Sequence, residues 1–212
     1  MHTKKKWPYS DLVTILIMIP MVSFYSFSLD LYIPLLPTIG HAIGSTKQAM
    51  QYTNSLFMLF CGMGQLIFGP LSDRYGRLRI IQISLSIFII ANTLCYFAQD
   101  YSALLIGRIL QAIGACGSYL CCFATIRDIY DSDEQSAAMF SYLNIANSLS
   151  AIIAPTLGTI IGAAFGWQHI FSTLAITCAI TYSYYQLLAI ETAPMEKLAT
   201  KSQNIISDYY RV

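Results

Sequence analysis

Charged side chains are scarce in this sequence. Of its 212 residues, 12 are Lys or Arg and 11 are Asp or Glu, together 11% of the chain, whereas 56% are hydrophobic. A soluble domain usually carries about 25% charged residues, and a soluble core of this length could not bury so much apolar surface. The formal net charge of +1 excludes the strong basic field of a nucleic-acid-binding protein. The composition therefore predicts an integral membrane protein.

Motifs for covalent or metal chemistry are also missing. The sequence has neither a phosphate-binding loop nor a nucleophile–base pairing, and its three histidines are isolated from one another. Its cysteines lie inside apolar runs without the spacing of a zinc or redox motif, which favours a packing role. They are Cys61, Cys95, Cys116, Cys121, Cys122 and Cys178. We therefore expect no enzymatic activity, no metal site and no cofactor.

Long runs without charge define the expected membrane spans. The uncharged runs are residues 12–29, 48–72, 80–99 and 135–190, and the run 101–126 holds a single charge. Because one span needs about 20 apolar residues, the last run is long enough for two helices joined by a turn. The sequence thus predicts an all-α membrane protein with six transmembrane helices, near 11–35, 48–70, 79–98, 101–125, 135–163 and 167–190. Capping-box spacings at 45–48 and 132–135 support two of these helix starts.

Basic residues gather on one side of this arrangement. With six spans, the amino-terminal segment, the second and fourth connections and the tail share one side, whereas the opposite connections hold only Lys47. The positive-inside rule makes the basic side cytoplasmic, so we expect both termini there. The chain divides into a transmembrane bundle, residues 1–192, and a polar cytoplasmic tail, residues 193–212.

Two charges fall inside the expected spans. An ionisable residue within a membrane helix is costly and is a functional candidate by default. Asp30 lies near the outer end of the first helix and Arg108 at a similar depth in the fourth, so the two could pair across a shared cavity. Gln111 is one turn further along the face of Arg108. The alternatives are that Asp30 caps or pairs at the outer interface, and that Arg108 snorkels outward or binds backbone carbonyls.

A compact charged turn joins the expected second and third helices. It runs from Gly69 through Asp73, Arg74 and Gly76 to Arg77. Glycine permits a sharp reversal of the chain, an aspartate accepts hydrogen bonds from a helix amino terminus, and arginines pair with acids or helix carboxyl ends. The spacing is more specific than that of a generic basic loop.

The expected fifth helix combines a proline with spaced glycines. Pro155 removes one backbone hydrogen bond and can kink the helix. Gly158, Gly162 and Gly166 recur every four residues, so we expect them on one face that another helix can approach closely. This pattern favours helix packing and leaves a gating role open.

Several aromatic residues suit either a cavity or the helix packing. Aromatic faces attract organic cations, although packing is the commoner role of such side chains. The candidates are Tyr25, Phe57, Tyr119, Phe123 and Tyr142.

Together these motifs resemble a known family. The turn Gly69-x-Leu71-x-Asp73-Arg74-x-Gly76-Arg77 resembles the signature loop of the major facilitator superfamily. Arg108-x-x-Gln111-x-x-Gly114 is similar to its fourth-helix motif, and Ala154-Pro155-x-x-Gly158 to the fifth-helix motif of its antiporters. The first-helix sequence Leu29-Asp30-Leu31-Tyr32-x-Pro34-x-x-Pro37 resembles that of drug:proton antiporters. With Gly64-Gln65-Leu66-Ile67-Phe68-Gly69-Pro70, the set looks most like the bicyclomycin/chloramphenicol-resistance type.

This resemblance implies a fold and a function. The fold is the amino-terminal half of a twelve-helix transporter, built of two inverted three-helix repeats. The function is proton-coupled efflux of small drug-like molecules across the bacterial inner membrane by alternating access. By position, Asp30 and Arg108 become proton- and substrate-coupling residues. Gly69, Asp73, Arg74, Gly76 and Arg77 become the cytoplasmic gate. The implied partners are lipid, a small-molecule substrate and no nucleic acid, with the proton gradient as energy source.

The sequence also departs from the family pattern. Ala112, Ala154 and Thr159 stand where glycine is usual, and Gln168 where arginine is common. A complete family member needs roughly 400 residues, and the sequence matches only the first half. Transport would therefore need a second six-helix half or self-association. The alternative is a truncated, transport-inactive half or a membrane interaction protein.

Overall fold

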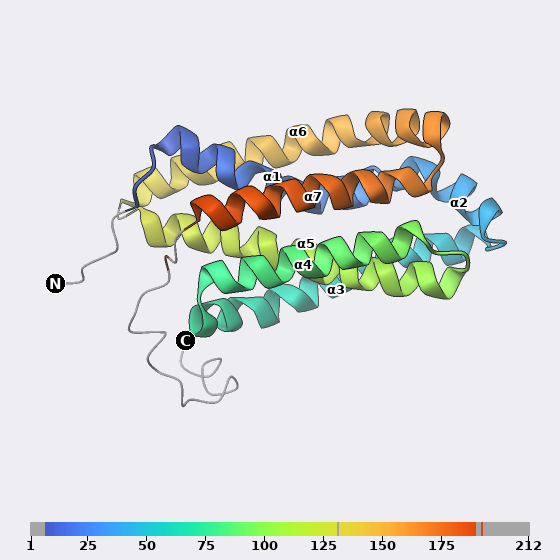
Figure 1. The fold of residues 1–212 in the computed structure, drawn as a ribbon, viewed down its shortest axis with the longest axis horizontal. Coiled ribbons are helices and arrows are strands. Elements are labelled where there is room, and N and C mark those ends of the chain that lie inside the picture. The colour runs from blue at the N-terminus through green and yellow to red at the C-terminus, as the bar shows by residue number, and fades with distance from the viewer. Residues whose placement is uncertain (1–6, 131, 190–191, 193–212) are drawn as a thin grey trace.

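The computed structural model describes residues 7–130, 132–189 and 192, and these residues form helices and connecting segments without a strand. The long helices lie side by side along one axis (Figure 1). In chain order the elements are α1 (Asp11–Asp30), η1 (Ile33–Leu35), α2 (Leu36–Ala42), α3 (Lys47–Tyr75), α4 (Arg77–Tyr96), α5 (Tyr101–Ile129), α6 (Asp133–Phe165) and α7 (Gln168–Leu188).

Five segments of the described chain are long and apolar enough to cross a membrane. They are Asp11–Ala42, Lys47–Tyr75, Arg77–Tyr96, Tyr101–Ile129 and Asp133–Phe165. The sixth expected span, α7, does not reach that apolarity because Ser, Thr and Tyr residues interrupt it. Its hydroxyls nevertheless bond to backbone carbonyls one turn earlier, as Thr177 does to Thr173 and Thr181 to Thr177. α7 packs against α4 and α1 as the sixth long helix of the bundle.

Three of the described helices, α3, α5 and α6, are longer than the spans expected from the uncharged runs. α3 continues to Tyr75 and α5 to Ile129, so the charged segments at these two ends are helical rather than loops. Three capping side chains accept a hydrogen bond from the first turn of a helix: Thr46, Asp100 and Ser132. The cap at Ser132 was expected, whereas the second helix is capped by Thr46 rather than by the neighbouring Ser45.

The packing pattern of the helices is pseudo-symmetric. α1 packs on α6 and α7, and α5 packs on α3 and α4. These two groups of three helices, α1 with α6 and α7, and α5 with α3 and α4, meet where α1 contacts α5 and where α4 contacts α7. If α1, α3 and α4 are exchanged in that order for α5, α6 and α7, the same set of main helix contacts results. This is what two three-helix repeats are expected to give. α1 and α5 thus lie at the centre of the bundle.

The connections alternate between the two ends of the bundle. The start of α1, the α3–α4 turn, the α5–α6 connection and the end of α7 lie together at one end (Figure 1, left). α2 and the α4–α5 and α6–α7 turns lie at the other. Two of the tight turns are made by Gly76 and Gly166, whose φ angles of 95° and 96° disfavour any residue with a side chain. The predicted tail, residues 193–212, lies outside the described residues.

Candidate functional site

Arg108 lies in the middle of the bundle with no exposed surface. Its guanidinium carbon lies 4.2 Å from the ring centroid of Tyr32, which follows α1, and 4.4 Å from that of Phe57 on α3. Both rings can therefore offer the cation a π face. Tyr32 is itself fixed, because its hydroxyl shares a 2.8 Å hydrogen bond with Thr53 on α3.

Neutral oxygen atoms accept the hydrogen bonds of this buried cation. Arg108 Nη1 donates to the Ser28 carbonyl at 2.7 Å and to Gln111 Oε1 at 2.6 Å, and Nη2 lies 3.4 Å from Asn54 Oδ1. Gln111 Nε2 donates in turn to Asn92 Oδ1 at 2.8 Å. The sequence motif indicated Gln111, whereas Asn54 and Asn92 were missed. In the sequence, each of these two residues is an amide side chain inside an otherwise apolar run, and this feature could have marked it as a candidate site residue.

The predicted Arg108–Asp30 ion pair is not formed among the described residues. Arg108 instead binds the Ser28 carbonyl in the last turn of α1. Such carbonyls lack a helical donor and carry the negative end of the helix dipole. Nη1 of the cation is therefore held by the backbone end of α1 rather than by a carboxylate, and the buried Nε has no hydrogen-bond partner among the described residues. Binding to backbone carbonyls, one of the alternatives from the sequence, is what the structure shows.

Asp30 is the last residue of α1 and is half-buried. Helix α1 ends here because Pro34, four residues later, has no N–H to offer the Asp30 carbonyl. The Leu35 N–H bonds to the Tyr32 carbonyl at 3.1 Å, which starts the short η1 helix. The expected continuous helix 11–35 is thus broken, and the break carries Asp30 on one side and Tyr32 on the other.

Helix α6 lies against this break. A Cβ on Gly158 would come within 2.3 Å of the Leu31 carbonyl oxygen, and a Cβ on Gly162 within 2.5 Å of the Leu35 side chain. These two glycines therefore allow a close approach, as their spacing predicted. Gly166 does not share the contact, because it ends α6 in the turn toward α7. Pro155 lies inside α6, which continues through it without a break.

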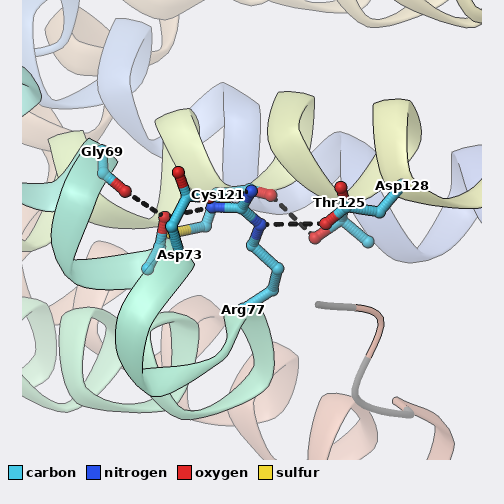
Figure 2. Close-up of polar contacts among 7 residues, drawn as sticks. Gly69, Asp73, Arg77, Cys121, Thr125 and Asp128 are labelled. Atoms are coloured by element: carbon cyan, nitrogen blue, oxygen red, sulfur yellow. Dashed lines mark hydrogen bonds and ion pairs between the residues drawn. The ribbon is translucent and has the colours of Figure 1, made fainter. Parts of the chain in front are cut away.

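A second polar cluster lies at the α3–α4 turn (Figure 2). Arg77 is buried and forms an ion pair with Asp73 and a hydrogen bond with Ser72, and its Nε lies 3.0 Å from Asp128 Oδ2 on α5. The Ser72 hydroxyl donates to the Gly69 carbonyl at 2.9 Å. Three helix ends are thereby joined through one guanidinium.

The sequence predicted most of this cluster but not its partner on α5. Gly69, Asp73, Gly76 and Arg77 lie together as the motif implied. Arg74 points its guanidinium toward the Tyr75 ring, 5.7 Å from the centroid. Asp128 was missed, because a carboxylate directly after a basic residue at a helix end looks like ordinary interfacial charge.

A row of aromatic rings links Arg108 to the end of the bundle that carries this cluster. Neighbouring ring centroids lie 4.9 to 6.4 Å apart. The row consists of Phe57, Tyr25, Tyr119, Phe123 and Phe140. Arg127 lies over its last ring, 5.9 Å from the Phe140 centroid. Tyr142 was expected in this group, but its side chain is exposed on α6 and its neighbour Phe140 takes that place.

Comparison with known sequences identifies the family. The sequence profile of the Major Facilitator Superfamily matches residues 18–205. The chain belongs to this superfamily. It is 33% identical over 170 residues to a chloramphenicol resistance protein of Pseudomonas aeruginosa, covering 80% of this chain and 41% of that protein. It is 28% identical over 195 residues to the multidrug resistance protein MdtL of Shigella dysenteriae, covering 90% and 50%.

Solved structures of the superfamily share the fold. The proton:xylose symporter XylE aligns with a TM-score of 0.76 at 11% identity, over 90% of this chain and 50% of that one. The human organic anion transporter MFSD10 aligns with a TM-score of 0.72 at 17% identity, over 89% and 50%. The chain spans about half the length of the curated relatives it matches. It is therefore a membrane protein with the fold of one half of a superfamily transporter.

Proposed function

We propose that this chain takes part in proton-coupled efflux of small, drug-like molecules across the bacterial inner membrane, with both termini in the cytoplasm. The observation that carries the proposal is the fully buried Arg108, whose neutral acceptors include the Ser28 carbonyl, two residues before the half-buried Asp30 at a broken helix. Intramembrane ionisable groups in transporters mark proton or substrate pathways. The names of the chloramphenicol and multidrug resistance relatives support a drug-like substrate.

Asp30 is the proposed proton site, and Arg108 is the fixed charge that responds to it. The carboxyl of Asp30 lies two residues beyond the carbonyl that Arg108 binds. A change in the charge of Asp30 therefore alters the field at the end of α1 where the guanidinium is held. Substrate would lie over the neighbouring aromatic row, whose faces accept flat or cationic compounds.

The Arg77 cluster is the proposed cytoplasmic gate. It ties the α3–α4 turn to the end of α5 through Asp73 and Asp128. Alternating access requires two arrangements of the bundle ends, and one buried guanidinium shared by two carboxylates can stabilise one of them. Loosening these contacts would release the helix ends.

Transport needs a second six-helix half, which the chain would meet through α3 and α6. These helices expose polar residues within their spans, among them Gln65 and Asn144. Amides are unfavourable toward lipid and usually face protein or a water-filled cavity. A cavity closed by a second half would place both of them away from lipid.

The test is ethidium accumulation in cells that lack their main efflux pumps. The chain is expressed alone and with a carboxyl-terminal half from a relative, with and without a protonophore. Lower accumulation that is abolished by the protonophore and by Asp30→Asn supports the proposal. The matched control is Asp133→Asn, because Asp133 is an exposed carboxylate at the start of α6. If well-expressed chain behaves like empty vector in both settings and with several drug classes, the transport-inactive alternative holds.

A further inference from the structure

The contact between α6 and the break after α1 differs from an ordinary helix crossing. One hydrogen of Gly158 Cα points at the Leu31 carbonyl oxygen, since a Cβ built in that direction would lie 2.3 Å from this oxygen and 3.0 Å from Leu31 C and Cα. All three atoms belong to the backbone. A Cα–H···O contact of this kind is common where helices approach closely.

Leu31 separates the two residues that matter most at the site. On one side is Asp30, and on the other is Tyr32, whose ring stacks on Arg108. The backbone here is held by few helical bonds, because Pro34 removes a donor and the Leu35 N–H turns to Tyr32. The atom that α6 touches therefore lies where the regular helical hydrogen bonding of the first span is interrupted.

The rest of the α1–α6 interface is fixed by side chains. Ser150 Oγ lies 2.9 Å from Ser23 Oγ, and Ser26 Oγ lies 2.7 Å from Asn147 Oδ1. These pairs hold the register of the two helices within α1 itself. Beyond Asp30 the contact of Gly158 with the Leu31 backbone replaces them, so that the position of the break depends on this residue of α6.

We propose that Gly158 is a positioning residue for Asp30 and Tyr32, acting through the Leu31 backbone. An added methyl group at Gly158 must displace this backbone, which shifts the Asp30 carboxyl relative to the Arg108 cluster. The inference rests on the proposed function in one respect, namely that Asp30 is the proton site. Gly158 itself touches neither a proton nor a substrate in this scheme.

Two other glycines provide matched controls. At Gly162 an added methyl group would meet the end of the Leu35 side chain, which can rotate away. At Gly62 on α3 it would meet nothing within 4 Å. Both substitutions are Gly to Ala inside a helix, so the effect of helix propensity is matched across the series.

The experiment is a titration of Asp30 in the purified full chain reconstituted in lipid. Infrared absorption of the protonated carboxyl is isolated as the difference from the Asp30→Asn variant. We expect Gly158→Ala to move the midpoint by about half a pH unit or more, in either direction, while Gly162→Ala and Gly62→Ala titrate like the unmodified chain. Equal midpoints for all three variants would overturn the proposal.

A second variant covers the case in which Gly158→Ala does not fold. Pro34→Ala restores an N–H for the Asp30 carbonyl and lets α1 continue, which withdraws Leu31 from α6 without adding an atom at the interface. It should move the same midpoint, and an unchanged midpoint would count against Gly158. Because the readout is independent of transport, an Asp30 that titrates in a chain without export activity would refute the proposed function alone.

Discussion

At the scale of single residues, Arg108 shows how a membrane bundle holds a charge without a counter-ion among the described residues. Two aromatic faces, one backbone carbonyl and two side-chain amides surround the guanidinium. Such a planar, weakly hydrated cation suits stacking and forked hydrogen bonding, whereas an ammonium is compact and strongly hydrated. The site is therefore built for arginine in particular, rather than for any positive charge.

Arg108→Lys should lower the stability of the chain despite keeping the charge. The planar stacking on two rings and at least one hydrogen bond are lost, and a hydrogen bond to a charged group is worth about 1.5 to 3 kcal/mol. The measurement is thermal unfolding in detergent. Arg79→Lys is the control, because Arg79 is exposed at the start of α4. Equal unfolding temperatures for the two variants would contradict the arrangement described here.

At the scale of elements, polar contacts tie helix ends together in addition to the polar pairs within the spans. Arg77 joins the α3–α4 turn to α5. The Tyr130 hydroxyl donates to Asp11 Oδ1 at 2.7 Å, and the Tyr9 hydroxyl to the Leu188 carbonyl at 2.9 Å. Burial, together with the hydrogen bond to Asp11, raises the pKa of Tyr130 to about 12. The phenol therefore stays a donor across the physiological pH range.

Arg77 and Asp128 should be energetically coupled. A double-mutant cycle with Arg77→Gln and Asp128→Asn is expected to give an interaction energy of about 1 to 3 kcal/mol in the free energy of unfolding, as for contacting residues in a network. Asp133→Asn replaces Asp128→Asn in the control cycle, where additivity is expected. An additive result for Arg77 and Asp128 would show that the ion pair does not hold α5.

Tyr130→Phe should weaken the link between α1 and α5. Loss of one hydrogen bond to a carboxylate is expected to lower stability by about 1 to 2 kcal/mol. Unfolding is followed by circular dichroism beside Tyr142→Phe, whose side chain is exposed on α6. The interpretation fails if both variants unfold at the same temperature.

At the scale of the whole molecule, the alternation of connections gives the bundle two chemically different ends. The end with the Arg77 cluster also carries Arg74, Arg79 and Arg127, whereas the other end carries α2 and the α6–α7 turn. The positive-inside rule supports the proposal that the first end faces the cytoplasm. The six cysteines are all buried and free, so the chain offers little background to thiol labelling.

A membrane-impermeant maleimide should therefore report the orientation. We expect His41→Cys, exposed on α2, to be labelled on spheroplasts, and Arg79→Cys only after the membrane is permeabilised. The unmodified chain controls for the native thiols. Labelling of Arg79→Cys in intact spheroplasts would reverse the proposed orientation.

The sequence was sufficient to predict where the long helices lie and which residues form the motifs. It was not sufficient to predict which of these residues contact one another. Uncharged runs locate spans because the bilayer excludes charge, and Arg108 with Gln111 lay one helical turn apart as expected. Asp30 and Arg108 were expected to pair on grounds of depth alone. Sequence could not reveal that Pro34 ends α1 early and leaves the Ser28 carbonyl as the nearer acceptor. Asp128 was missed because its partner is remote in the chain.

The hydroxyl-rich α7 bears on the order in which the chain assembles in the membrane. It is the long helix that falls short of the apolarity of a membrane span, and its buried side, with Phe171, Leu174 and Cys178, lies against the rest of the bundle. A segment of this kind gains little from lipid alone, so its retention after synthesis depends on helices that are already in place. We therefore expect the membrane insertion of α7 to depend on α4, the helix against which it mainly packs.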